Sequence, residues 1–198
     1  MKTYFISALL LIMLCSGMVS GQNNVQYYDV IHRDQLVGST VVKKVGNDQN
    51  FTITLSFSAD IDFLIKRVVI TGREYARFEN RVLKSGSVYR KVNDKVKTDN
   101  TIKHLGSYYK VQDGEKSHTL AIEEIRDNML SLFFSEPDRI NTVYADNQQK
   151  LVSIAEAAPK KYVVPGKNDS SSTYIFQNGQ CSSVILKSKL VTLILKRR

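Results

Sequence analysis

The sequence predicts a mainly β protein, formed by an antiparallel curved sheet or incomplete β-barrel of consecutive hairpins. Three observations lead to this fold class. Apolar and polar residues alternate in short runs along the chain, and turn-forming pairs such as Asp113-Gly114 and Asn178-Gly179 separate the runs. Only one stretch, near 124–135, has helical spacing. Tight turns between neighbouring strands favour a meander of hairpins over a parallel α/β architecture.

The first residues have the three-part pattern of a secretory signal. Lys2 precedes an apolar run at 4–14, and small residues follow it. The run is too short to span a bilayer. We therefore expect residues 1–21 to be a signal peptide that is cleaved before Gln22, and the protein to be exported to the periplasm or the extracellular space.

The mature chain is expected to be a single β-rich domain over 22–198, with no transmembrane segment. Cys15 suggests a lipoprotein signal, but Leu14 stands where such a signal requires a small residue, so the sequence argues against lipidation. Cys181 would be the one cysteine left after cleavage. The expected domain therefore has no internal disulfide.

The first half of the predicted domain consists of strands between polar turns. In Phe51–Phe57, for example, every second residue is apolar and the others carry hydroxyl groups, as in a strand with one buried face. The predicted strands of this half are 25–31, 36–44, 51–57, 65–78, 81–92, 95–105, 108–112 and 116–122.

Two of these hairpins allow a prediction of strand register. A three-residue loop after Val92 would place that residue opposite Val96 and Gly86 opposite Ile102. A two-residue loop would instead place Val92 opposite Lys95, and we predict the first register. Asp113-Gly114 as the two central turn residues would place His118 opposite Tyr109.

A short buried helix is expected near 124–135. Asp127 is a candidate N-cap and Pro137 would end the helix. Its apolar residues are too numerous for a surface helix, so we expect it to fill the concave face of the sheet or cap one end. These residues are Ile122, Ile125, Met129, Leu130, Leu132, Phe133 and Phe134.

The chain after Pro137 returns to predicted strands. Asn178-Gly179 is its clearest hairpin signal, and it places Cys181 opposite Phe176. In such apolar surroundings we expect a buried, unreactive thiol. The strands expected here are 142–144, 151–155, 161–164, 173–177, 180–187 and 190–195.

The formal net charge of +9 is concentrated in residues 81–110. Tyrosines interleave with the basic residues there, as on surfaces that stack on sugars or bases. The alternative is a solvated lysine-rich strand face that prevents edge-to-edge aggregation. The basic residues are Arg81, Lys84, Arg90, Lys91, Lys95, Lys97, Lys103 and Lys110. The expected ligand-binding residues are Arg90, Lys91, Lys95, Lys97, Tyr89 and Tyr109.

The sequence offers little chemistry for catalysis or metal binding. The histidines His32, His104 and His118 are scattered, so we predict no metal site. Asp60 and Asp62 could form an acid/base pair in a hydrolase if one pKa were raised, but no third positioned group accompanies them. We therefore predict no catalytic residues and no cofactor.

Three groups of residues resemble a known family. The first is an N-terminal Tyr-x-Val strand with a Val-Gly turn, the second a Leu-x-x-Phe-Phe-x-Glu-Pro segment at 130–137, and the third a Tyr-x-Phe-x-Asn-Gly-x-Cys hairpin at 174–181. Together they resemble an exported bacterial family of small antiparallel β proteins whose function is unknown. The resemblance implies a periplasmic or secreted protein and assigns no catalytic residues.

These observations lead to a ranked set of functions. The first is an exported, non-enzymatic protein that binds an anionic envelope polymer or lipid through the basic strand face. The second is a periplasmic carrier that holds a lipid or other hydrophobic ligand inside the curved sheet, and the third is the Asp60/Asp62 hydrolase. Charge alone would also allow nucleic acid, but the export signal argues against it.

Overall fold

The computed structural model describes residues 22–63 and 66–198. The expected signal peptide at 1–21 and its Cys15 lie outside the described residues. Within them, no helix is both long enough and apolar enough to cross a membrane.

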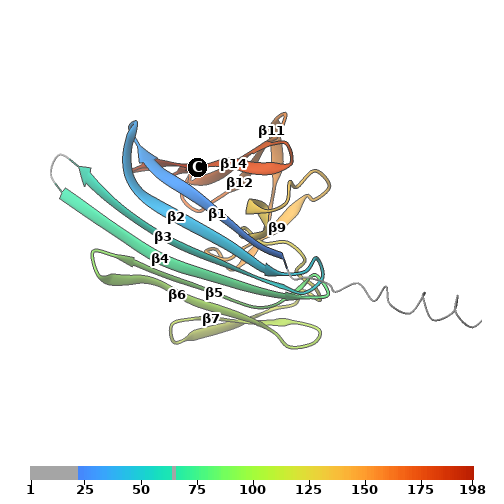
Figure 1. Cartoon of the computed structure of the whole chain (residues 1–198). Coiled ribbons are helices and arrows are strands. Elements are labelled where there is room, and N and C mark those ends of the chain that lie inside the picture. The colour runs from blue at the N-terminus through green and yellow to red at the C-terminus, as the bar shows by residue number, and fades with distance from the viewer. Residues whose placement is uncertain (1–21, 64–65) are drawn as a thin grey trace, which may run out of the picture.

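Thirteen antiparallel strands form one strongly bent sheet (Figure 1). The N-terminal part of the sheet is β1 (Gln22–His32), β2 (Gln35–Gly46), β3 (Phe51–Phe63), β4 (Lys66–Glu79), β5 (Val82–Val92), β6 (Lys95–His104), β7 (Tyr109–Asp113) and β8 (Lys116–Leu120). The C-terminal part is β11 (Ala155–Ala158), β12 (Lys161–Pro165), β13 (Ser171–Gln177), β14 (Gln180–Lys187) and β15 (Thr192–Arg197). A separate hairpin pairs β9 (Thr142–Ala145) with β10 (Lys150–Ser153).

The topology is that of consecutive hairpins. Strands that follow one another in each part are neighbours in the sheet, and β15 pairs with β1 through Val30 and Leu195 to join the two parts. The sheet is not closed into a barrel, because β11 and β8 remain as its two edges. The predicted mainly β, antiparallel fold is therefore confirmed.

The hairpin between β13 and β14 has the predicted register. Phe176 lies opposite Cys181, and both turn residues, Asn178 and Gly179, have positive φ angles. Such angles are required at both central positions of a type I′ turn, and Asn-Gly adopts them readily.

The predicted registers of the β7–β8 and β5–β6 hairpins need correction. In the β7–β8 hairpin, Tyr109 pairs with Leu120, and His118 pairs with Val111. The central turn residues are Gly114 and the residue after it, so the pairing shifts by two positions relative to the prediction. Among these two, Gly114 alone has a positive φ, of 58°, as in a type II′ turn.

The β5–β6 hairpin contains both of the registers considered from sequence. Val92 pairs with Lys95 at a two-residue turn, which is the alternative to the predicted pairing with Val96. Beyond a bulge next to Arg90 the register shifts by one, so that Gly86 pairs with Ile102.

The helix expected near 124–135 is not present, and a single 3-10 turn, η1 (Ser131–Phe133), stands in its place. Local side chains compete for the backbone groups that a helix would need. The Ser131 N–H donates to Asn128 Oδ1 (3.0 Å), and the Asn128 N–H donates to Ser131 Oγ (3.2 Å). This reciprocal pair resembles a capping box, but the chain ends the turn after three residues.

The backbone before η1 is bonded to the sheet and to β9. The N–H of Ile125 donates to the Tyr109 hydroxyl, and its carbonyl accepts from the Leu83 N–H. Asn128 forms a parallel bridge with Tyr144 of β9. Asp127 is therefore no N-cap, since its carbonyl accepts from Tyr144 and its backbone begins no helix.

The bent sheet forms a trough, whose floor and walls are the inner, concave face of the sheet. The segment nonetheless fills one end of this trough, as its apolar composition requires. We call residues 125–134 together with the β9–β10 hairpin the plug. In Figure 1 the strand β9 lies inside the bend, between the walls formed by β14 above and β5 below. The most buried apolar side chains of this segment are Ile125, Leu130, Leu132 and Phe133.

Candidate functional site

A cavity with a volume of about 420 Å³ lies on the inner, concave face beside the plug. Its walls come from β1 to β5 on one side and from β12 to β15 on the other, and Met129, Leu130 and Phe133 of the plug close one end. The cavity reaches the loops at 166–170 and 187–188. Its volume falls within the range of about 300–1,000 Å³ that is typical of small-molecule sites.

Most of the cavity wall is apolar. Each strand contributes the residues of its inward face, and β3 alone supplies Leu55, Phe57 and Ala59 at alternate positions. Leu186 and Leu193 line the opposite wall and are only half-buried. This surface can hold a hydrocarbon chain or another apolar group.

An ion pair interrupts the apolar wall on β4 and β5. Arg90 Nη2 lies 3.3 Å from Glu74 Oε1, and the two side chains are 32% and 15% exposed. Burial raises the pKa of Glu74 above its ordinary value, and the positive charge of Arg90 offsets this effect only in part. Arg90 Nε, which is buried, has no hydrogen-bond partner among the described residues.

Gly72 makes room for this arrangement. A Cβ atom at Gly72 would come within 2.2 Å of the Phe57 ring, so a larger residue would displace that ring. The Arg90 guanidinium stacks over the same ring at 5.5 Å from its centre. The inward faces of β3 and β4 thus fix the position of Arg90, through the aromatic ring of Phe57 and the charge of Glu74.

Asp146 adds a second carboxylate at the plug end of the cavity. It follows β9, it is 6% exposed, and its Oδ1 accepts a hydrogen bond from Asn128 Nδ2 at 3.2 Å. Its Oδ2 has no partner among the described residues. Burial, reinforced by the negative charge of Glu74, raises the pKa of Asp146 to about 7.

The polar end of the cavity therefore contains two carboxylates and one guanidinium. When both acids are ionised, the three groups together carry one uncompensated negative charge; Lys187, the other charged residue of the cavity lining, is exposed. An unpaired buried charge of this kind is costly unless a ligand or a proton neutralises it. An apolar cavity with a few convergent polar groups is the usual form of a site for an amphipathic small molecule.

The residues expected to form the basic contact face do not share one face. Arg90 lines the cavity, and Tyr109 is fully buried, with its hydroxyl accepting from the Ile125 N–H. Tyr89 points to the outer face together with Lys91, whose ammonium lies 5.9 Å from the centre of the Tyr89 ring. The alternation of a strand separates these neighbours, because successive side chains point to opposite faces.

Several lysines of residues 81–110 do remain on the surface. Lys95, Lys97, Lys103 and Lys110 are exposed on β6 and β7. Within residues 22–63 and 66–198, none of these lysines forms a salt bridge. They form a basic strip near one edge of the sheet, together with the exposed Asp99 on β6. Lys95 pairs with Val92, which lines the cavity, whereas Lys103 pairs with Ser85 on the outer face, so the four lysines do not all point to one face.

Asp60 and Asp62, considered above as an acid/base pair, do not have the arrangement that catalysis would need. Asp60 accepts hydrogen bonds from the Arg67 guanidinium, including one of 2.8 Å from Nε. This partner lowers the pKa of Asp60, whereas a general acid in such a pair requires a raised pKa. Asp62 is exposed.

Cys181, His32 and His104 occupy structural positions, whereas His118 is exposed on β8. Cys181 is fully buried, and burial raises the pKa of its thiol to about 12, which disfavours the reactive thiolate. His32 contacts the Thr192 carbonyl, and His104 lies between Lys84 and the Glu123 carbonyl. In the part of the chain that the structure describes, no three His, Cys, Asp or Glu side chains form a group that could hold a metal ion.

Sequence reasoning missed Glu74 and Asp146, although each leaves a signal. Glu74 interrupts an otherwise apolar or small series at alternate positions, from Ile70 to Phe78, that forms the inward face of β4. Asp146 directly follows Val143-Tyr144-Ala145, a run in which every residue is buried. A charged residue on a buried face is the feature that should have drawn attention.

The comparisons with known proteins bear on the family of the chain. A family model described as "Domain of unknown function (DUF6134)" matches residues 28–198. Neither the curated proteins nor the solved structures include a match to the chain. The resemblance to a β-rich family of unknown function is thus confirmed at that level, while export and bacterial origin remain predictions. The chain belongs to the DUF6134 family.

Proposed function

We propose that the protein is a non-enzymatic binding protein that holds the apolar part of a small amphipathic molecule inside its curved sheet. The observation that carries this proposal is the cavity of about 420 Å³ between the walls of the trough and the plug. This is the carrier that the sequence suggested as its second choice. The plug, in place of the expected short helix, closes one end of the cavity.

The first experiment tests whether the cavity binds apolar molecules. The protein is titrated with the uncharged fluorescent probe N-phenyl-1-naphthylamine, whose emission rises in apolar surroundings. Ala59→Phe places a large side chain in the cavity and should abolish the signal. Ser58→Phe, one residue away on the outer face, is exposed and should leave it unchanged.

Two further measurements make this test decisive. Leu186→Trp narrows the cavity from the opposite wall at a half-buried position, so it serves if Ala59→Phe fails to fold. Native mass spectrometry of gently purified protein would identify a bound molecule directly. Equal probe binding by the wild type and by both folded variants would contradict the proposal.

A second candidate function rests on the basic strip. Lys95 and Lys97 are exposed without a salt bridge among the described residues, and Lys91 lies close to them in the chain, just before the turn between β5 and β6. This strip could bind an anionic envelope polymer or lipid surface. Changing these three lysines to Glu should abolish co-sedimentation with phosphatidylglycerol vesicles. The same change at Lys43, Lys161 and Lys196 is the control, because those lysines are exposed elsewhere.

We further propose that the protein is exported, on the basis of the signal pattern in residues 1–21. Expression of the full chain in a bacterium, followed by N-terminal sequencing of the periplasmic and secreted fractions, tests this. A mature N-terminus at Gln22 is the expected result. Retention of an uncleaved chain in the cytoplasm would contradict it.

A further inference from the structure

We propose that the polar end of the cavity binds the ammonium group of an amphipathic amine, between the carboxylates of Asp146 and Glu74. This inference rests on the proposed function and names the chemical class of the ligand. The alkyl part of the amine would lie along the apolar wall formed by Leu55, Phe57 and the facing strands.

The charges at the polar end argue for a cationic head group. Glu74 and Arg90 neutralise each other across 3.3 Å, and Asp146 has only the neutral amide of Asn128 as a side-chain partner. A carboxylate or phosphate head group would bring a further negative charge next to two existing ones. An ammonium group supplies the one positive charge that the site lacks.

The unpartnered atom at Asp146 points to the same head group. Oδ2 is buried and can accept a hydrogen bond, and an ammonium group has three donors. Gly86 of β5 lies close to this carboxylate, since a Cβ atom at that position would be in ordinary contact with Asp146 Oδ1 at 3.8 Å and would crowd Ile102 at 3.1 Å. The site is therefore a buried acceptor beside an apolar cavity.

The titratable groups that surround Asp146 predict how amine binding depends on pH. They are Glu74 of β4, Arg90 of β5, Tyr144 of β9 and Tyr174 of β13, and Lys187 of β14 lines the same cavity from an exposed position. Burial raises the pKa of both tyrosines well above neutrality, so they stay uncharged. An alkylamine remains cationic throughout the range from pH 6 to 8. Its affinity should therefore rise across that range as Asp146 loses its proton.

The experiment compares three ten-carbon ligands with the full-length protein by isothermal titration calorimetry at pH 8. Decylamine should bind most tightly, 1-decanol more weakly, and decanoate most weakly. Asp146→Asn keeps the side-chain shape and removes the charge. It should weaken decylamine by about 30-fold or more, because the loss of one partner of a buried charge pair typically costs this much. The affinity for 1-decanol should change little.

Two more variants test the charge count itself. The double variant Glu74→Gln, Asp146→Asn leaves Arg90 as the one charged group of the cluster, so it should prefer decanoate over decylamine. Asp99→Asn is the matched control, because Asp99 is exposed and lies opposite Tyr89, which points to the outer face. It should behave like the wild type.

The outcomes separate this inference from the proposed function. If decanoate binds the wild type as tightly as decylamine, or if Asp146→Asn leaves decylamine unaffected, the head-group assignment is overturned while the cavity proposal stands. If none of the three ligands binds the folded wild type and N-phenyl-1-naphthylamine also fails to bind, both are overturned.

Discussion

The plug and the cavity beside it are both lined by apolar side chains of the bent sheet, yet they differ in how completely the space is filled. In the plug, Leu130 and Leu132 are 1% exposed, and local partners satisfy the backbone of Asn128 and Ser131. Along the cavity, Leu186 and Leu193 are half-buried, and where the plug meets the cavity a buried oxygen of Asp146 lacks a partner among the described residues. The filled plug contributes stability, whereas the incompletely filled cavity is where a ligand can be stabilised.

The largest expected effect is the loss of packing in the plug. Leu132→Ala should lower the free energy of unfolding by about 3–5 kcal/mol, as for other fully buried leucines, because the rigid surroundings leave a cavity. Leu186→Ala, which only enlarges an existing cavity, should cost less than about 1.5 kcal/mol. Urea unfolding of both variants measures the difference. Equal losses would remove the distinction between the plug and the cavity.

The next effect is the pH dependence of stability caused by Asp146. Its pKa in the folded protein is about 7 against an ordinary value of 3.8, so the folded state binds this proton more tightly than the unfolded state. The contribution of Asp146 to the free energy of unfolding is fully present below pH 4 and is lost as the pH rises through 7. This loss lowers the free energy of unfolding by about 2–4 kcal/mol.

Asp146→Asn should therefore flatten the stability profile between pH 5 and 8. Some decline should persist in the variant, because the raised pKa of Glu74 acts in the same direction. Unfolding by urea at several pH values, compared between wild type and variant, checks the prediction. Parallel profiles for the two proteins would contradict it.

A smaller effect is expected from the hydrogen bond that ties the plug to the sheet. Tyr109→Phe removes the hydroxyl that accepts from the Ile125 N–H at 2.9 Å and leaves a buried donor unsatisfied. The expected cost is about 1–3 kcal/mol in unfolding free energy. Tyr108→Phe is the control, since Tyr108 is 38% exposed. A variant as stable as the wild type would mean that the plug is held by packing alone.

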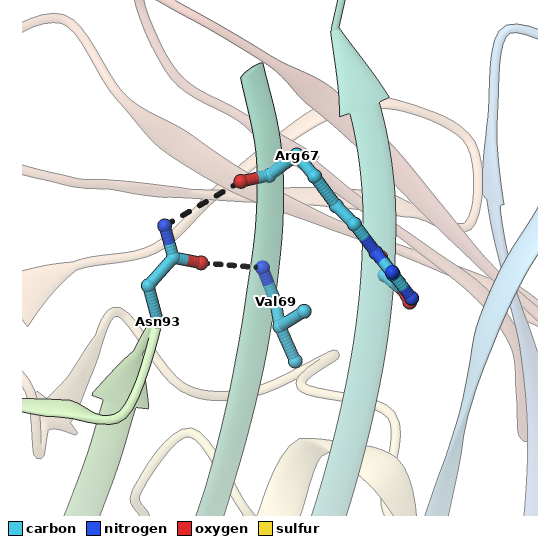
Figure 2. A network of polar contacts seen from close by, with 4 residues as sticks. Arg67, Val69 and Asn93 are labelled. Carbon is cyan, nitrogen blue, oxygen red and sulfur yellow. Dashed lines mark hydrogen bonds and ion pairs between the residues drawn. The ribbon is translucent and has the colours of Figure 1, made fainter.

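The smallest effect concerns the turn between β5 and β6, which contains Asn93. Asn93 Oδ1 accepts from the Val69 N–H, and Nδ2 donates to the Arg67 carbonyl, so this turn is tied to β4 (Figure 2). The φ angle of Asn93 is 47°, which a Gly residue adopts as readily as Asn. Asn93→Gly should therefore cost only about 0.5–1.5 kcal/mol, the value of the lost hydrogen bonds. Hydrogen exchange should show faster exchange at Val69 with no change at Leu83; equal exchange at both amides would contradict the proposed link.

Two of the mispredicted features, the helix and the shared basic face, have a common physical origin. Apolar spacing at Ile125, Met129 and Leu132 predicted burial correctly, but a buried segment can satisfy its backbone without forming a helix. Here the Tyr109 hydroxyl and the backbones of β5 and β9 provide the partners. The same limit applied to the basic face, where counting charges along the chain did not distinguish inward Arg90 from outward Lys91.

The sequence by itself determined the strands, their antiparallel pairing through tight turns, and the burial of Cys181 and the plug residues, because alternation and turn chemistry are local properties. Only the tertiary structure decided which strands face each other across the trough. The cluster of Glu74, Arg90 and Asp146 depends on that long-range arrangement, since Asp146 reaches the other two from a separate hairpin. No local pattern encodes such a meeting, and it is the reason that the candidate site became visible only in three dimensions.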